Sequence, residues 1–137
     1  LFETYRLLNQ PAALFERMGL WFELAAQGFK TTPEQPEPSR SDCHGWGAHP
    51  LYHYFATLLG IRPAGLGFDE VEIRPMPGAL THLSGEMVHP RGRLAADLHF
   101  ADETVRGTVA LPPGVQGTFR YAGKSLTLQP GAQSVAL

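Results

Sequence analysis

The segment GRLAADLHFADETVRGTVAL, residues 92–111, contains the clearest structural pattern in this chain. Apolar residues alternate with polar or small residues on both sides of a central Asp-Glu pair; they are Leu94, Ala96, Leu98 and Phe100 before it and Val105, Val109 and Leu111 after it. Successive side chains of a β-strand point to opposite faces, so this period of two predicts half-buried strands. The stretch therefore predicts two strands joined by a turn at 102–103, each with one face in a core.

The same period extends to the C-terminus and back to residue 71. Val71 with Ile73, Phe119 with Tyr121, Leu126 with Leu128, and Val135 with Leu137 each occupy one face of a short segment. Turn residues separate the segments at 90–92, 112–114, 123–124 and 130–131. Short strands at this spacing are typical of an antiparallel β-sandwich, with Phe119 and Tyr121 predicted to lie in its core.

The first part of the chain has helical spacing instead. Apolar residues recur at steps of three and four over residues 1–24, and Pro11 predicts a break between two short helices. Residues 27–40, rich in Pro, Gly and Thr, predict a long, stiff loop. A third helix is predicted from Trp46, with Ser41 or Asp42 before it as its cap and Gly60 as its end. The expected fold class is α+β, with a helical domain at 1–66 and a β-sandwich domain at 67–137.

Length, net charge and cysteine content reduce the number of possible classes of function. The chain has 137 residues, a formal net charge of -2 and one cysteine, Cys43, which cannot form an internal disulfide. The weak net charge disfavours nucleic acid as a partner, and no apolar run is long enough to cross a membrane. The chain begins at Leu1, so it is expected to be a piece of a longer protein, and its compartment is not predicted.

Reactive side chains gather between Thr31 and His53. His49 and His53 share a helical face, as metal-binding pairs do, but no third ligand has matching spacing, so no metal is expected. Adjacent Cys43 and His44 are a poor nucleophilic pair, and Cys43 is expected to be a small buried hydrophobe.

Glycoside chemistry fits the cluster better. It needs a carboxylate to activate water and aromatic rings to cover the apolar faces of a sugar. Glu34, between Pro33 and Pro36, is the candidate catalytic carboxylate; Arg40, Asp42 and His44 are candidate hydrogen-bond partners of sugar hydroxyls, and Trp46 is a candidate stacking platform. Each also has a structural interpretation: a solvated loop Glu, an N-cap Asp, a core Trp.

The segment SRSDCHGWGAHPLYHYFATLLGIRP, residues 39–63, resembles the end of the catalytic barrel in bacterial α-L-rhamnosidases. The family pattern has a Thr-Thr turn, a Glu, then Arg-Ser-Asp-Cys-His, a small residue, Trp, and a helix that ends in Gly-Ile-x-Pro. The segment GFDEVEIRPMPGALTHLSGEMVHPRGRLAADLHF, residues 67–100, is similar to the family's entry into its C-terminal β domain. The resemblance implies the C-terminal helices of an α/α six-hairpin barrel followed by an antiparallel β-sandwich.

The resemblance also implies an inverting glycoside hydrolase that removes terminal α-L-rhamnose without a cofactor. Glu34 corresponds to its general base, and His44, Trp46, Arg40 and Asp42 to sugar contacts; the spacer before Glu34 is one residue shorter than the family pattern, which leaves Glu37 as the alternative base. The general acid lies outside this piece, so the piece alone is expected to be inactive and to self-associate through its helical part. The alternatives are a non-catalytic carbohydrate-binding or structural β module, and a related helical-barrel glycosidase for another sugar.

Overall fold

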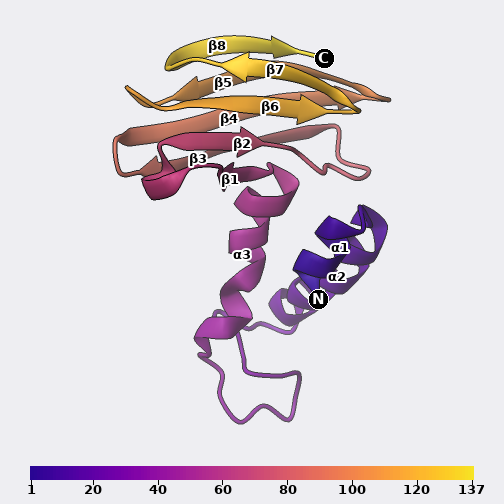
Figure 1. The fold of residues 1–137 in the computed structure, drawn as a ribbon. Coiled ribbons are helices and arrows are strands. Elements are labelled where there is room, and N and C mark those ends of the chain that lie inside the picture. The colour runs from indigo at the N-terminus through magenta and orange to yellow at the C-terminus, as the bar shows by residue number, and fades with distance from the viewer. The chain divides into compact units, whose positions relative to one another are not determined.

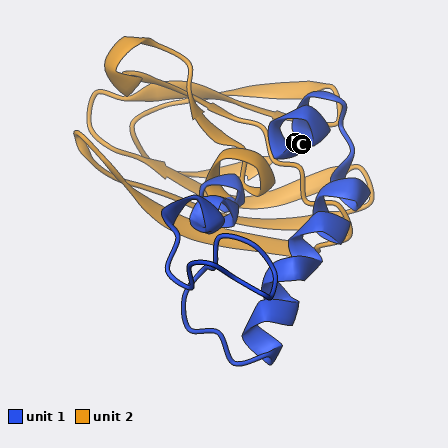
Figure 2. Cartoon of the chain, turned by 90° about the horizontal axis from the view of Figure 1, so that it is seen from below, with its two compact units in different colours: residues 1–54 blue, residues 55–137 orange.

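The computed structural model describes residues 1–137, which form two compact units, residues 1–54 and 55–137 (Figure 2). The boundary between the units falls inside the third helical segment, before the predicted domain boundary at 66/67. Residues just after it are tied to the β part: the Arg74 amide donates to the Gly60 carbonyl (2.9 Å), and the Met76 amide donates to the Leu58 carbonyl (3.0 Å). The domain boundary at 66/67, which concerns the longer protein, stays a prediction.

The first unit contains the two predicted N-terminal helices. Helix α1 covers Phe2–Leu7 and helix α2 covers Pro11–Ala26, so the break before Pro11 is confirmed. Pro11 occupies the first turn of α2, where a missing amide proton costs nothing. Residues 27–44 contain no helix or strand, as the loop prediction requires.

The predicted third helix is a series of three short segments. The 3₁₀ helix η1 covers Gly45–Ala48, α3 covers His49–His53, and the π-helix η2 covers Tyr54–Leu58. The predicted cap at Ser41 or Asp42 is wrong, because His44 is the N-cap of η1 and no side chain caps it. The end at Gly60 agrees with its φ of 72°, a conformation that glycine adopts without strain.

The second unit contains eight strands in two four-stranded sheets (Figure 1). One sheet has the order β1 (Ile61–Pro63), β2 (Glu70–Ile73), β6 (Gln116–Tyr121) and β7 (Lys124–Leu128). The other has the order β3 (His82–His89), β4 (Gly92–Ala101), β5 (Thr104–Leu111) and β8 (Gly131–Ala136). A short 3₁₀ helix, η3 (Leu66–Phe68), precedes β2.

Strand pairing is antiparallel except between β2 and β6, which run parallel from Glu70 opposite Gln116 to Ile73 opposite Phe119. The sequence did not predict this pairing, because a parallel partner is distant along the chain and leaves no turn between the two strands. It also did not predict β1, which is three residues long, or β3, whose exposed face interrupts the apolar pattern.

The core of the second unit follows the alternation in residues 92–111. Leu94, Leu98 and Val105 are completely buried, and Phe100 pairs with Val105 across the predicted turn. Phe119 is also fully buried, as predicted, whereas Tyr121 is only half-buried and packs its ring 5.5 Å from that of Phe100. The two sheets thus bury the faces that the alternation predicted, and the sandwich is confirmed.

None of the helices is long and apolar enough to span a bilayer.

Candidate functional site

The loop between α2 and η1 is folded back on itself by hydrogen bonds. The Glu34 amide donates to the Ser41 carbonyl (2.8 Å), and the His44 amide donates to the Thr32 carbonyl (2.7 Å). The Thr32 hydroxyl donates in return to the His44 carbonyl (2.9 Å). The loop therefore presents Glu34 and His44 from two paired segments, rather than as a freely moving connection.

Gly47 allows this loop to approach the helical part of the unit closely. A Cβ at this position would lie 2.8 Å from the Thr32 Cβ and 2.9 Å from the Pro33 carbonyl oxygen, closer than real Cβ atoms pack. The Gly47 carbonyl also accepts a hydrogen bond from the Trp21 indole N–H (2.6 Å). The loop, η1 and α2 thus meet at one glycine.

A hollow of about 310 Å³ opens where these three segments meet. This volume is at the lower end of the range for small-ligand sites, roughly 300–1,000 Å³. Its lining combines one carboxylate with aromatic and apolar groups: Glu34, Trp21, Trp46, His49, Leu20, Leu24, Pro33, Gln35, Pro36 and Gly47. A single acid among aromatic rings is an arrangement typical of a carbohydrate site.

Glu34 is held in the ionised state by its partner. The Arg40 Nε donates to Glu34 Oε2 (2.8 Å), and a second guanidinium nitrogen donates to Oε1. This hydrogen bonding by Arg40 lowers the pKa of Glu34; partial burial opposes it, and the charge of His44 adds to the lowering. The side chain of Glu34 is 21% exposed, against 81% for Arg40, so the carboxylate faces inward and the guanidinium outward.

The alternative base, Glu37, is placed differently. Its carboxylate accepts a hydrogen bond from the Ser39 amide (2.8 Å), is exposed, and does not line the hollow. The two acids therefore differ in surroundings: Glu34 faces the aromatic hollow, and Glu37 closes a turn at the surface.

The structure brings four of the five candidate residues together. Trp46 lines the hollow with 77% of its surface exposed, and the His44 ring stacks on it at a centroid distance of 5.3 Å. Arg40 joins them through Glu34. Asp42 does not join them: it is exposed, and its backbone carbonyl accepts from the Thr31 hydroxyl. The roles of all five residues stay predictions.

The structure adds two residues that sequence reasoning did not assign to a sugar site, Trp21 and His49. Trp21 had helical spacing, which predicted only a core face, so no signal in the sequence distinguished it. His49 was considered only as a metal ligand with His53. The rings of His49 and His53 pack against Phe2 at 4.9 and 5.1 Å, which makes them part of an aromatic cluster. Cys43 is exposed, so its predicted burial is wrong.

Comparison with known protein families assigns the chain to one of them. The family model of the bacterial alpha-L-rhamnosidase C-terminal domain matches residues 60–130, more than half of the chain. The chain therefore belongs to this family. A comparison with curated proteins found no match.

Solved structures of α-L-rhamnosidases share the fold. The native enzyme from Aspergillus terreus is 18% identical with a TM-score of 0.69, over 85% of this chain and 15% of that one. The enzyme from Dictyoglumus thermophilum is 11% identical with a TM-score of 0.69, over 83% and 17%. The enzyme from Streptomyces avermitilis, complexed with L-rhamnose, is 19% identical with a TM-score of 0.61, over 76% and 12%. The chain thus spans less than a fifth of each of these structures.

Proposed function

We propose that this chain is the C-terminal part of a glycoside hydrolase that removes terminal α-L-rhamnose with inversion of configuration. The observation that carries the proposal is the inward-facing, Arg40-paired carboxylate of Glu34 in a hollow walled by Trp21 and Trp46. Family membership and the structures of α-L-rhamnosidases support the choice of sugar. The Streptomyces avermitilis enzyme was solved in complex with L-rhamnose, which makes that sugar the first ligand to test.

In this mechanism Glu34 is the general base. An inverting enzyme needs an ionised carboxylate that removes a proton from water while the water oxygen attacks the anomeric carbon. A lowered pKa suits this role and not that of the general acid, which must be protonated before reaction. The two carboxylate oxygens have lone pairs beyond those used by Arg40, so one oxygen can also accept the water proton.

The general acid completes the reaction from another part of the longer protein. It protonates the glycosidic oxygen as the bond from that oxygen to the anomeric carbon breaks, and an inverting pair is separated by about 6.5–9.5 Å. Because that acid lies outside residues 1–137, we propose that the chain alone binds sugar weakly and hydrolyses nothing.

The test is an assay of the longer reading frame with an aryl α-L-rhamnoside. Glu34→Gln is expected to lower kcat by about 10²–10⁴-fold, the usual contribution of a general base. Glu37→Gln is the matched control and is expected to retain near-normal kcat. Azide should restore turnover to Glu34→Ala, because a small anion can attack in place of activated water; this separates a catalytic loss from misfolding. Loss of turnover in Glu37→Gln but not in Glu34→Gln would reverse the assignment.

Proton NMR of the first product identifies mechanism and sugar together. Inversion predicts that β-L-rhamnose appears first and then mutarotates to the equilibrium mixture. If α-L-rhamnose appears first, the inverting proposal fails while the hydrolase proposal stands. If the longer protein releases a different sugar and no rhamnose, the alternative of a related helical-barrel glycosidase replaces the proposal of an α-L-rhamnosidase.

The remaining alternative, a carbohydrate-binding or structural β module, has less support. The large hydrophobic residues exposed in the second unit are Leu66, Leu80 and Val88, none of which is aromatic. A sugar-binding sandwich stacks sugars on exposed aromatic rings. Titration of the chain with L-rhamnose discriminates: chemical-shift changes in strands of the sandwich, and none around Trp46, would favour the β module.

The helical unit also supports a proposal about association. Phe22, Trp46 and Leu51 are 74%, 77% and 68% exposed. Apolar surface of this kind is normally covered, and we propose that the rest of a barrel covers it in the longer protein. The chain alone is then expected to self-associate, which light scattering across a concentration series would detect. A monomer at all concentrations that binds no hydrophobic dye would contradict this.

A further inference from the structure

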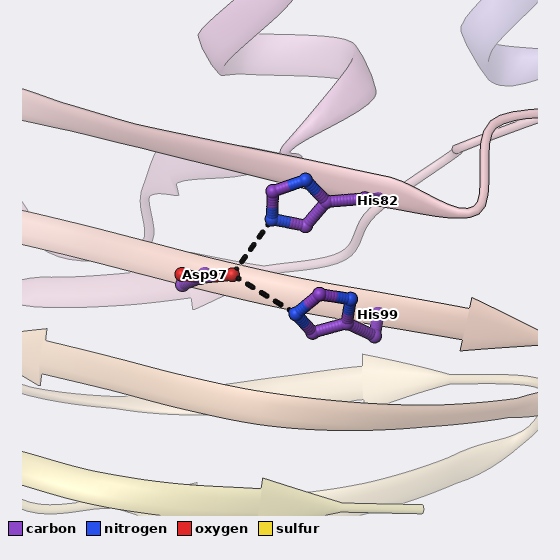
Figure 3. A group of neighbouring side chains, drawn as sticks. All are labelled: His82, Asp97 and His99. Carbon is purple, nitrogen blue, oxygen red and sulfur yellow. Dashed lines mark hydrogen bonds and ion pairs between the residues drawn. The ribbon is translucent and has the colours of Figure 1, made fainter.

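Two histidines and one aspartate converge on the exposed face of the β3-β4-β5-β8 sheet, in the second unit. Figure 3 shows His82 on β3 and Asp97 and His99 on β4, with both imidazole rings directed at the same carboxylate. Their potential ligand atoms all lie within 4.8 Å of one another. We propose that these three residues form a binding site for a borderline divalent transition-metal ion such as Zn²⁺, separate from the proposed sugar site.

The geometry is close to that of a three-ligand metal site. His82 Nε2 lies 2.8 Å from Asp97 Oδ1, and His99 Nε2 lies 3.5 Å from the same oxygen. Bonds of about 2.0–2.2 Å in a tetrahedral arrangement separate neighbouring ligand atoms by roughly 3.3 Å. The three side chains are 48%, 56% and 65% exposed, so small rotations can open them around an ion.

The sheet itself sets this arrangement. His82 is directly opposite His99 in the β3-β4 pairing, and Asp97 is two residues from His99 on the same strand. Directly opposed residues and residues two apart share one face of a sheet, so all three side chains point the same way. The imidazole rings are stacked 4.4 Å apart with an interplanar angle of 13°. The β3-β4 ladder therefore preorganises the ligands before any ion binds.

The strand behind Asp97 is also fixed closely. A Cβ at Gly107 on β5 would lie only 1.9 Å from the Asp97 carbonyl oxygen, so glycine lets β5 pack directly against β4 at this point. A ligand backbone held on both sides, by β3 and by β5, moves little when the side chain binds.

The ligand set selects the class of ion. Two imidazoles and one carboxylate favour Zn²⁺, Co²⁺, Ni²⁺ and Cu²⁺ over Mg²⁺ and Ca²⁺, which prefer oxygen ligands only. Three protein ligands leave at least one coordination position open to water or to a ligand from another molecule. The nearest positive charge by register is Arg106 on β5, which is exposed and lies directly opposite His99. Its cation should weaken the site.

The test uses the intact chain without a histidine tag, titrated with ZnCl₂ by calorimetry and followed by NMR of its histidine rings. We expect saturable binding, with the largest shifts at His82 and His99. His82→Gln, His99→Gln and Asp97→Asn should each lower the affinity roughly tenfold or more, because even partners outside the ligand shell change metal affinity by about 10–100-fold. Excess Mg²⁺ should not displace the ion.

Two variants on the same sheet face sharpen the test. Glu86→Gln removes an exposed carboxylate that pairs with Arg93 (2.7 Å) and should leave Zn²⁺ affinity unchanged. Arg106→Gln should raise it. Far-UV circular dichroism confirms that each variant is folded. Unchanged affinity in both His82→Gln and His99→Gln, or shifts confined to His44, His49 and His53, would overturn the proposal.

Discussion

The two units of this chain differ in how well they bury their large apolar side chains. The second unit surrounds a core of fully buried residues, including Phe119, Leu94 and Leu98, with two hydrogen-bonded sheets. The first unit consists of short helices and a loop, and it leaves Phe22 and Trp46 largely exposed. The buried core of the second unit predicts that it is stable by itself, whereas the helical unit leaves large apolar side chains in contact with water.

We expect a large difference in local stability between the two units. In native-state hydrogen exchange of the intact chain, amides of β4 and β5 should exchange only at the free energy of global unfolding. Amides of α1 and α2 should exchange through local opening, at a much lower free energy, because Phe2, Leu14 and Leu24 are the only buried residues of these helices. Equal protection of the amides in α2 and β4 would contradict this expectation and show that the chain unfolds as one cooperative structure.

The next effect tests the close contact between Gly60 and Arg74 at the start of the second unit. Gly60→Ala places a Cβ 1.9 Å from the Arg74 carbonyl oxygen at a residue with a φ of 72°. We expect a loss of more than about 2 kcal/mol in the free energy of unfolding, since both strain and a clash contribute.

Gly123→Ala is the matched control for Gly60→Ala. Gly123 has a similar φ of 78° with open space around its position for a Cβ. It should lose only about 1–2 kcal/mol, the cost of the left-handed backbone conformation. Urea unfolding measures the free energy of unfolding of both variants. Equal losses would show that the close approach of Gly60 to Arg74 has no separate effect.

A smaller effect tests the loop in the first unit. Gly47→Ala forces Thr32 and Pro33 away from η1, because its Cβ would lie 2.8 Å from the Thr32 Cβ. The near-UV circular dichroism of Trp21 and Trp46 should change and L-rhamnose binding should weaken, while the strands keep their protection. Gly45→Ala, which has open space around it, should do neither. If the spectra of both variants are similar, the close contact at Gly47 does not determine the shape of the hollow.

The smallest effect concerns the ionisation of Glu34. Carbon NMR titration should place its pKa below the ordinary glutamate value of about 4.3, because Arg40 stabilises the ionised form. This contribution to folding is present at neutral pH and is lost as the pH falls through the lowered pKa. Arg40→Met should raise the pKa of Glu34, whereas Arg93→Met, whose partner is Glu86, should not. An unchanged Glu34 pKa in Arg40→Met would contradict the assigned cause.

Prediction from sequence succeeded where the pattern was local. The break at Pro11, the end at Gly60 and the strands around Leu94 and Val105 follow from single-residue geometry or from a period of two. The cap prediction failed because the first helical turn begins at Gly45, so Ser41 and Asp42 lie before the N-cap position, which His44 occupies. The burial of Cys43 failed because residue type alone does not fix which side of a loop faces water.

The amino-acid sequence alone predicted the fold class, the loop that holds the acidic residues, and the family to which the chain belongs. Three features became visible in the folded chain: Glu34 and not Glu37 lines a hollow, Trp21 lines the same hollow, and His82 lies beside Asp97 and His99. These features depend on contacts between residues that are far apart in the sequence. Periodicity and turn chemistry act between neighbours along the chain, whereas a site is made by side chains whose distances are set by strand register and packing.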